Sequence, residues 1–206
     1  KALGQPAEGL LDGIEVNGAG ELVVSSRFRG TQATQPALDA LLIHQLSLSL
    51  EGTPEAALRH SVRRLELTCL ALPHLRGFSS LQSLAITLLP HATWTDLSSW
   101  EPLPALRELT LIAAGTPDQP VMLASLSGLQ APNLEIAGLR QLGLSSIDAL
   151  SGSPNLRYVD LAHNPEISSI RALAGSANCL ESLNLEGCAG IADLAALQGS
   201  KLLSTL

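Results

Sequence analysis

Aromatic residues are scarce in this chain of 206 residues, at 2% of the sequence, although hydrophobic residues make up 46%. A globular core usually combines aromatic with aliphatic side chains to fill irregular gaps. A core made almost wholly of aliphatic residues therefore indicates one small packing unit that is used many times. The hydrophobic content also excludes a disordered chain, because such chains lack the apolar surface that offsets the entropy of ordering.

Basic residues are also few. Lys1 and Lys201 are the only lysines, the arginines form no run, and the formal net charge is −7. Nucleic acid is excluded as the main partner, because binding a phosphate backbone requires clustered Lys and Arg. No apolar stretch reaches the roughly 18 residues needed to cross a bilayer, so the sequence predicts no membrane span.

Cysteine is sparse, and Cys69, Cys179 and Cys188 form an odd set that does not fit a disulfide framework. No Asn-x-Ser/Thr glycosylation sequence occurs. Both observations favour a reducing, intracellular compartment, and we expect the cytoplasm. No signal peptide stands at the start, but the chain begins with Lys1 rather than Met, which leaves an upstream targeting segment open.

Sequences typical of catalysis are missing as well. The chain has no phosphate-binding Gly-x-x-x-x-Gly-Lys-Ser/Thr loop, no Gly-x-Ser-x-Gly elbow and no His-Glu-x-x-His. Cys69 and His74 have the spacing of a metal pair, but no second pair matches them, and a zinc site needs four convergent ligands. We therefore expect no enzyme activity, no catalytic residue, no metal and no cofactor.

Two tryptophans, Trp94 and Trp100, lie in a Pro-rich segment between Pro90 and Pro104. Exposed tryptophans often anchor a binding partner, whereas buried ones fill a core. We favour local packing for both residues and keep a contact role as the alternative.

An internal repeat accounts for most of the chain. The pattern apolar-x-x-Leu-x-Leu occurs seven times if Val, Ile and one Ala are accepted at its three anchor positions, and all 21 anchors are aliphatic. The copies are Ile43–Leu46–Leu48, Val62–Leu65–Leu67, Leu81–Leu84–Ile86, Leu106–Leu109–Leu111, Ala131–Leu134–Ile136, Leu156–Val159–Leu161 and Leu180–Leu183–Leu185.

The middle anchors are separated by 19, 19, 25, 25, 25 and 24 residues. A degenerate copy is expected upstream at Ala19–Leu22–Val24, and a further copy begins at Leu203–Leu206, where we expect it to be truncated. Residues between the anchors are mostly polar, as expected of a strand whose alternate side chains face opposite sides. In the second half of the copies, leucines and isoleucines recur every three residues, as at Ile167, Ile170 and Leu173, which predicts short helical or 3₁₀ turns.

These residues resemble the leucine-rich-repeat family over Leu22 to Leu206, most closely in Leu156–Asn164 and Leu180–Cys188. The resemblance implies an α/β fold: a right-handed, horseshoe-shaped solenoid with a parallel sheet on its concave face and helical or 3₁₀ turns on its convex face. Residues 21–206 would form the solenoid, and residues 1–20 an N-terminal cap. The family motif closes each strand segment with Asn or Cys, which Asn164 and Cys188 match. Other copies have Leu70, Leu89, Ala114 and Leu139 at this place, which predicts irregular coils.

Repeat solenoids present extended binding surfaces. The leading hypothesis is therefore a non-catalytic interaction module, or scaffold, that binds another protein on the concave strand face. The alternatives are the substrate-recognition arm of a larger enzyme, such as a ubiquitin ligase subunit or a bacterial effector, and a structural subunit of a large assembly. The predicted partner-binding residues are Arg64, Glu66, Glu108, Thr110, Glu135, Tyr158, Asp160, Asn184 and Glu186.

Overall fold

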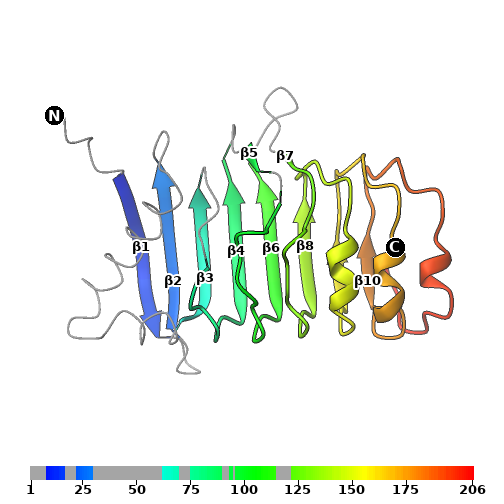
Figure 1. Ribbon diagram of the computed structural model, residues 1–206, viewed down its shortest axis with the longest axis horizontal. Coiled ribbons are helices and arrows are strands. Elements are labelled where there is room, and N and C mark those ends of the chain that lie inside the picture. Colours follow the sequence, from blue (N-terminus) through cyan, green and yellow to red (C-terminus); the bar gives the residue numbers. More distant parts are fainter. Residues whose placement is uncertain are drawn as a thin grey trace.

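One long sheet dominates the computed structural model, which describes residues 8–16, 22–29, 62–69, 75–89, 93–94, 96–114 and 122–206. The eight strands lie in the order β1-β2-β3-β4-β6-β8-β9-β10 (Figure 1). Their bounds are β1 Glu8–Val16, β2 Leu22–Arg29, β3 Val62–Cys69, β4 Ser83–Leu88, β6 Glu108–Ala113, β8 Ile136–Arg140, β9 Tyr158–Asp160 and β10 Ser182–Asn184. The remaining elements are β5 Thr93–Trp94, β7 Met122–Leu123 and the 3₁₀ helices η1 Asp148–Gly152, η2 Arg171–Ser176 and η3 Ala195–Leu197.

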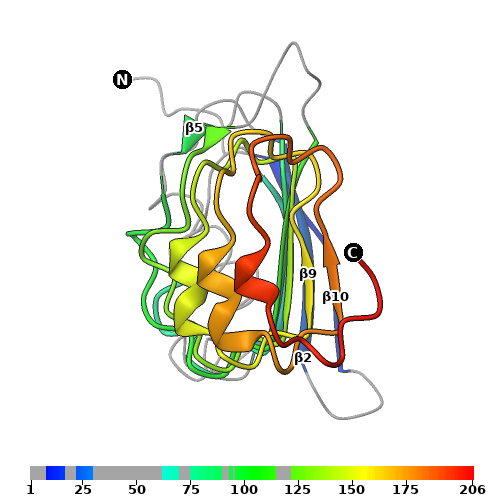
Figure 2. The same cartoon turned by 90° about the vertical axis from the view of Figure 1, so that its right-hand side faces the viewer.

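The sheet is parallel from β2 to β10, and β1 pairs antiparallel with β2 at one edge. Parallel neighbours require the chain to cross back between strands. The return segments that the structure describes lie on one side of the sheet, where η1, η2 and η3 stack on one another (Figure 2). This arrangement is compatible with an α/β solenoid-like fold.

The predicted anchors are aligned across most of the sheet. Leu84 pairs with Leu65 on one side and with Leu109 on the other, so the short spacing of 19 residues between Leu65 and Leu84 is confirmed. At the far end Val159 pairs with Leu183, and Ser182 bridges Thr205 in parallel, which places the copy at Leu203–Leu206 in the predicted register.

The predicted register of β8 is wrong by three residues. Leu109 pairs with Ala137 rather than with Leu134, and the buried anchors of this copy are Leu134, Ala137 and Leu139, each fully inaccessible to solvent. Ile136, predicted as an anchor, is half-buried on the opposite side of the strand. The physical reason is that a strand alternates its faces, so only one of the two neighbours Ile136 and Ala137 can point into the core.

The register of β2 also differs from the prediction. Val24 pairs with Leu65, whereas the repeat pattern placed Leu22 at the middle position. In addition, β2 pairs directly with β3, although the pattern predicts the copy at Ile43–Leu46–Leu48 between them. Those three residues lie outside the described part of the chain.

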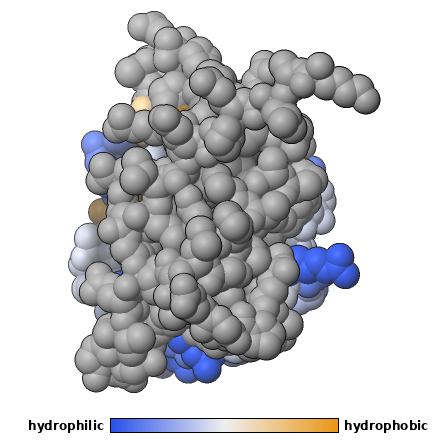
Figure 3. All heavy atoms as spheres, turned by 90° about the vertical axis from the view of Figure 1, so that its left-hand side faces the viewer, coloured by the Kyte–Doolittle hydropathy of each residue, from blue (hydrophilic) through white to orange (hydrophobic). Residues whose placement is uncertain are grey.

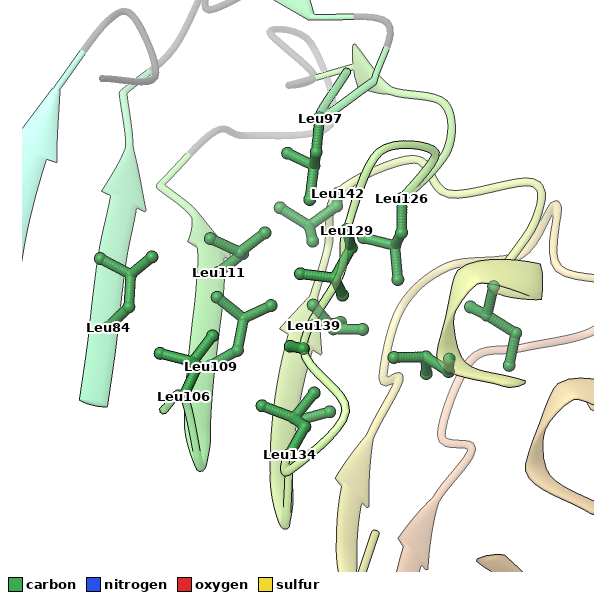
Figure 4. Close-up of a cluster of buried hydrophobic side chains, with 14 of the residues drawn as sticks. Leu84, Leu97, Leu106, Leu109, Leu111, Leu126, Leu129, Leu134, Leu139 and Leu142 are labelled. Atoms are coloured by element: carbon green, nitrogen blue, oxygen red, sulfur yellow. The ribbon is translucent and has the colours of Figure 1, made fainter. Parts of the chain in front are cut away.

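The core lies between the sheet and the return segments, where leucines from both layers meet (Figure 4). The three-residue rhythm is confirmed, because Ile167, Ile170 and Leu173 are all buried. Trp100 takes part in the same core with 5% of its surface exposed, so packing is confirmed for this residue. The side chain of Trp94 lies outside the described residues.

At Asn164, the turn that follows the strand is closed as the motif predicts. The buried amide of Asn164 accepts hydrogen bonds from the backbone N–H groups of Leu142 (3.0 Å) and Leu144 (3.1 Å) through Oδ1. Its Nδ2 donates to the carbonyl groups of Leu139 and Leu161, both at 2.7 Å. With β8 in its observed register, Leu142 rather than Leu139 is the counterpart of Asn164 in that copy.

Candidate functional site

The face of the sheet opposite the return segments, here called the outer sheet face, is the candidate site. Parallel sheets are usually covered on both sides. Within the described residues, however, no helix or strand packs on this face (Figure 2). On β3, β4, β6, β8, β9 and β10 the residues that face outward are Arg64, Glu66, Thr68, Ser83, Ala85, Thr87, Glu108, Thr110, Ile112, Ile136, Gly138, Arg140, Tyr158, Asp160, Ser182 and Asn184.

Most of the predicted partner-binding residues belong to this face. Arg64 and Glu66 lie on β3, and Glu108 and Thr110 lie on β6. Arg64 reaches across β4 to Glu108, with 3.9 Å between Nη2 and Oε2. Because both side chains are more than two-fifths exposed, this ion pair contributes little stability and mainly shapes the charge of the surface.

Glu135 is the predicted site residue that the structure places elsewhere. It precedes β8, and its backbone N–H donates to the carbonyl of Arg107, the residue that precedes β6. Its carboxylate pairs with the Arg107 guanidinium at 2.5 Å. The shift of three residues in β8 is the cause, and Gly138 occupies the position predicted for Glu135 between Thr110 and Asp160.

The observed register adds three residues that the sequence analysis missed, namely Ile136, Gly138 and Arg140. Ile136 lies beside Tyr158, and Gly138 lies beside Asp160. Arg140 forms an ion pair with Asp160, with 3.5 Å between Nε and Oδ2. In this register Leu134 aligns with Leu106 and Leu156, the residues that begin the neighbouring copies. The sequence contains this alternative alignment, but its hydrophobic pattern does not select it over the predicted one.

Tyr158 is held in place by a hydrogen-bonded cluster at the start of β9. Its hydroxyl donates to Oε2 of Glu181 at 2.5 Å, and the Arg157 Nε donates to Oε1 of the same carboxylate at 2.8 Å. The Arg157 guanidinium also lies 5.8 Å from the centre of the Tyr158 ring. Glu181 thus holds both Arg157 and Tyr158, and the Tyr158 ring has a fixed orientation although the residue is 42% exposed.

The same cluster shifts the protonation equilibria of its members. The hydrogen bond to Glu181, and then the negative charge of that carboxylate, raise the pKa of Tyr158 above its ordinary value. The hydrogen bonds from Tyr158 and Arg157 lower the pKa of Glu181. Both shifts favour a neutral phenol and an ionised carboxylate.

A shallow groove of about 340 Å³ opens on the outer sheet face over β8, β9 and β10. Its floor includes Gly138, which has no side chain, and Ile136 and Tyr158 supply apolar surface. Asp160, Asn184 and Thr205 add polar groups. Apolar surface combined with a few polar groups is typical of binding sites.

Glu186, the last of the predicted residues, lies just beyond β10 near one end of the groove. Its backbone N–H donates to Oδ1 of Asn184 at 3.0 Å, and its side chain is 70% exposed. The imidazole Nε2 of His163 lies 4.0 Å from its carboxylate. Asp160 holds its own turn in the same way, by accepting the N–H of Ala162 at 3.0 Å.

Apart from the outer sheet face, the described residues contain few groups that could bind a metal or react. No group of three or more His, Cys, Asp or Glu side chains that could hold a metal ion occurs among them. Cys179 and Cys188 are free thiols, and burial raises the pKa of the Cys188 thiol, which lies 3.1 Å from the Leu161 carbonyl oxygen. Within the same residues, none of the helices is both long and apolar enough to cross a membrane.

The chain matches no protein-family model and no curated protein. Figure 3 shows the molecule from the β1 end, where the described residues that are visible at its margins are mostly hydrophilic.

Proposed function

We propose that the chain is a leucine-rich-repeat solenoid. Three features support this proposal: the aligned aliphatic anchors, the three-residue rhythm of the return segments, and the buried Asn164 that bonds the backbone of two neighbouring turns. The turn residues Gln141, His163 and Gly187 all have positive φ angles, of 58°, 61° and 72°, at the same place in three successive copies. A left-handed backbone conformation at the same place in successive copies indicates that these copies share one type of turn.

On this fold we propose a non-catalytic module that binds another protein through the outer sheet face. The single observation that carries the proposal is the parallel sheet face on which no described element packs, with its groove at β8, β9 and β10. Tyr158 supports it further, because a fixed and exposed aromatic ring gives a large contact area at a small entropic cost.

Site-specific photo-crosslinking tests this proposal. A photoreactive amino acid replaces Ser182, which lines the groove, or Ser168, which is exposed on a return segment. We expect protein adducts from position 182 that are absent from position 168. Those adducts should disappear when Gly138→Leu fills the groove.

The result that would overturn the proposal is equally definite. Identical adducts from both positions, or adducts from position 182 that survive Gly138→Leu, would show that the outer sheet face does not select the partner. Circular dichroism and urea unfolding of each variant confirm that the fold is retained.

A further inference from the structure

We infer that the partner presents an extended segment with one apolar side chain for the hollow over Gly138 and one basic side chain for Glu186. This inference rests on the proposed function and assigns the partner's chemistry. It is carried by the shape of the groove floor and by the balance of charges around it.

The space above Gly138 is the reason to expect an apolar side chain on the partner. Because Gly138 has no side chain, a neighbouring molecule can approach the backbone here, in space that a Cβ atom, 3.4 Å from Oγ1 of Thr110, would otherwise occupy. Ile136 and Tyr158 border the hollow and offer it apolar surface. An aliphatic side chain of the partner would remove this apolar surface from water, which favours binding.

The charges around the groove are the reason to expect a basic side chain on the partner. Among the described residues near it, Arg140 is engaged by Asp160, and Arg157 is engaged by Glu181. Glu186 is the remaining carboxylate near the groove, and within the part of the chain that the structure describes only the His163 imidazole lies in ion-pair range of it, at 4.0 Å. This end of the outer sheet face is therefore negative on balance, and it complements a Lys or Arg side chain.

The spacing between the two contacts can be estimated from sheet geometry. Asn184 lies two strands across the sheet from Gly138, and Glu186 follows Asn184 by two residues. With about 4.8 Å between strands and about 3.3 Å per residue, the separation is roughly 12 Å. An extended peptide spans this distance in about three to four residues, so the apolar and basic residues should be separated by that interval.

Selection from a display library of random linear peptides tests the inference on the full chain. Selected peptides should be enriched in an aliphatic residue and an Arg or Lys three to four positions apart. Gly138→Leu and Glu186→Lys should each weaken their binding about tenfold or more. Glu166→Lys, an exposed control on a return segment, should leave binding unchanged. Peptides in which the basic residue is replaced by Glu should recover binding to Glu186→Lys.

The outcomes separate this inference from the proposed function. If selected peptides lose binding in Gly138→Leu but show no basic residue or do not respond to Glu186→Lys, the inference is overturned and the binding face stands. If no peptide is selected while position 182 still crosslinks to a partner, the extended-segment inference is likewise overturned. Peptides that bind every variant equally would overturn both.

Discussion

At the scale of the residue, Asn164 shows how a single side chain can specify the fold. All its amide hydrogen bonds go to backbone groups of its own turn and the preceding one, and the side chain is fully buried. The motif predicted this role, because few side chains other than Asn can donate and accept at once in so small a volume. The Tyr158 cluster was not predictable in the same way, since Glu181 lies 23 residues away and meets Tyr158 only through the stacking of copies.

Replacing Asn164 should therefore be costly. Asn164→Ala leaves the N–H groups of Leu142 and Leu144 buried without acceptors, and we expect the free energy of unfolding to fall by about 2–4 kcal/mol. Urea unfolding measures this loss. The matched control is the exposed Asn155→Ala, which should change the value by less than about 0.5 kcal/mol. Equal effects of the two changes would refute the role of the buried amide.

The titration of Tyr158 tests the cluster directly, because it is the only tyrosine in the chain. Its pKa is raised by Glu181, so the ultraviolet absorbance of tyrosinate should appear at a pH above the ordinary value of 10.0. The group holds its proton more tightly when folded, so its contribution to stability is present below the ordinary pKa and is lost as the pH rises through the folded one. In Glu181→Gln the midpoint should fall towards the ordinary value. Unchanged titration in that variant would show that the carboxylate does not hold the phenol.

At the scale of the element, strand β8 shows what the sequence pattern could and could not predict. The existence of a strand near Leu134 was predictable from the repeat, because aliphatic residues recur there. The register of β8 was not predictable, because Ile136 fits the anchor pattern, whereas the residue that is buried, Ala137, is small. The regular spacing of 25 residues favoured the wrong alignment. A pattern of hydrophobicity cannot choose between two adjacent aliphatic residues, and packing against β6 makes that choice.

The register of β8 can be tested with two neighbouring substitutions. Ala137→Asp places a charge in the core and should lower the free energy of unfolding by about 3 kcal/mol or more. Ile136→Asp on the outer sheet face should lower it by about 1 kcal/mol or less. Urea unfolding of both variants gives the comparison. The reverse order of stability would support the register in which Ile136 is buried.

At the scale of the whole molecule, the outer sheet face is a surface that no single copy of the repeat contains. Nine residues were predicted from the sequence to lie on that face, and all except Glu135 lie on or beside it, because polar residues alternate with the anchors along each strand. The sequence did not predict the groove, which depends on Gly138 lying beside Asp160. That neighbour is set by the stacking of copies of unequal length, whereas Thr205 lies beside Ser182 as the predicted register requires.

The central claim is that this face, and not the return segments, binds the partner. Two glycines allow a matched measurement, because Gly138 lies in the groove and Gly175 lies in η2. A Cβ added to Gly175 would meet no atom within 4 Å other than those of its chain neighbours and of the backbone of its own helix. The partner captured by crosslinking is purified, and its dissociation constant is measured by calorimetry for the unmodified chain and for each variant. We predict that Gly138→Leu raises the dissociation constant at least about tenfold, whereas Gly175→Leu leaves it unchanged. A loss of affinity in Gly175→Leu alone, or in neither variant, would contradict the account.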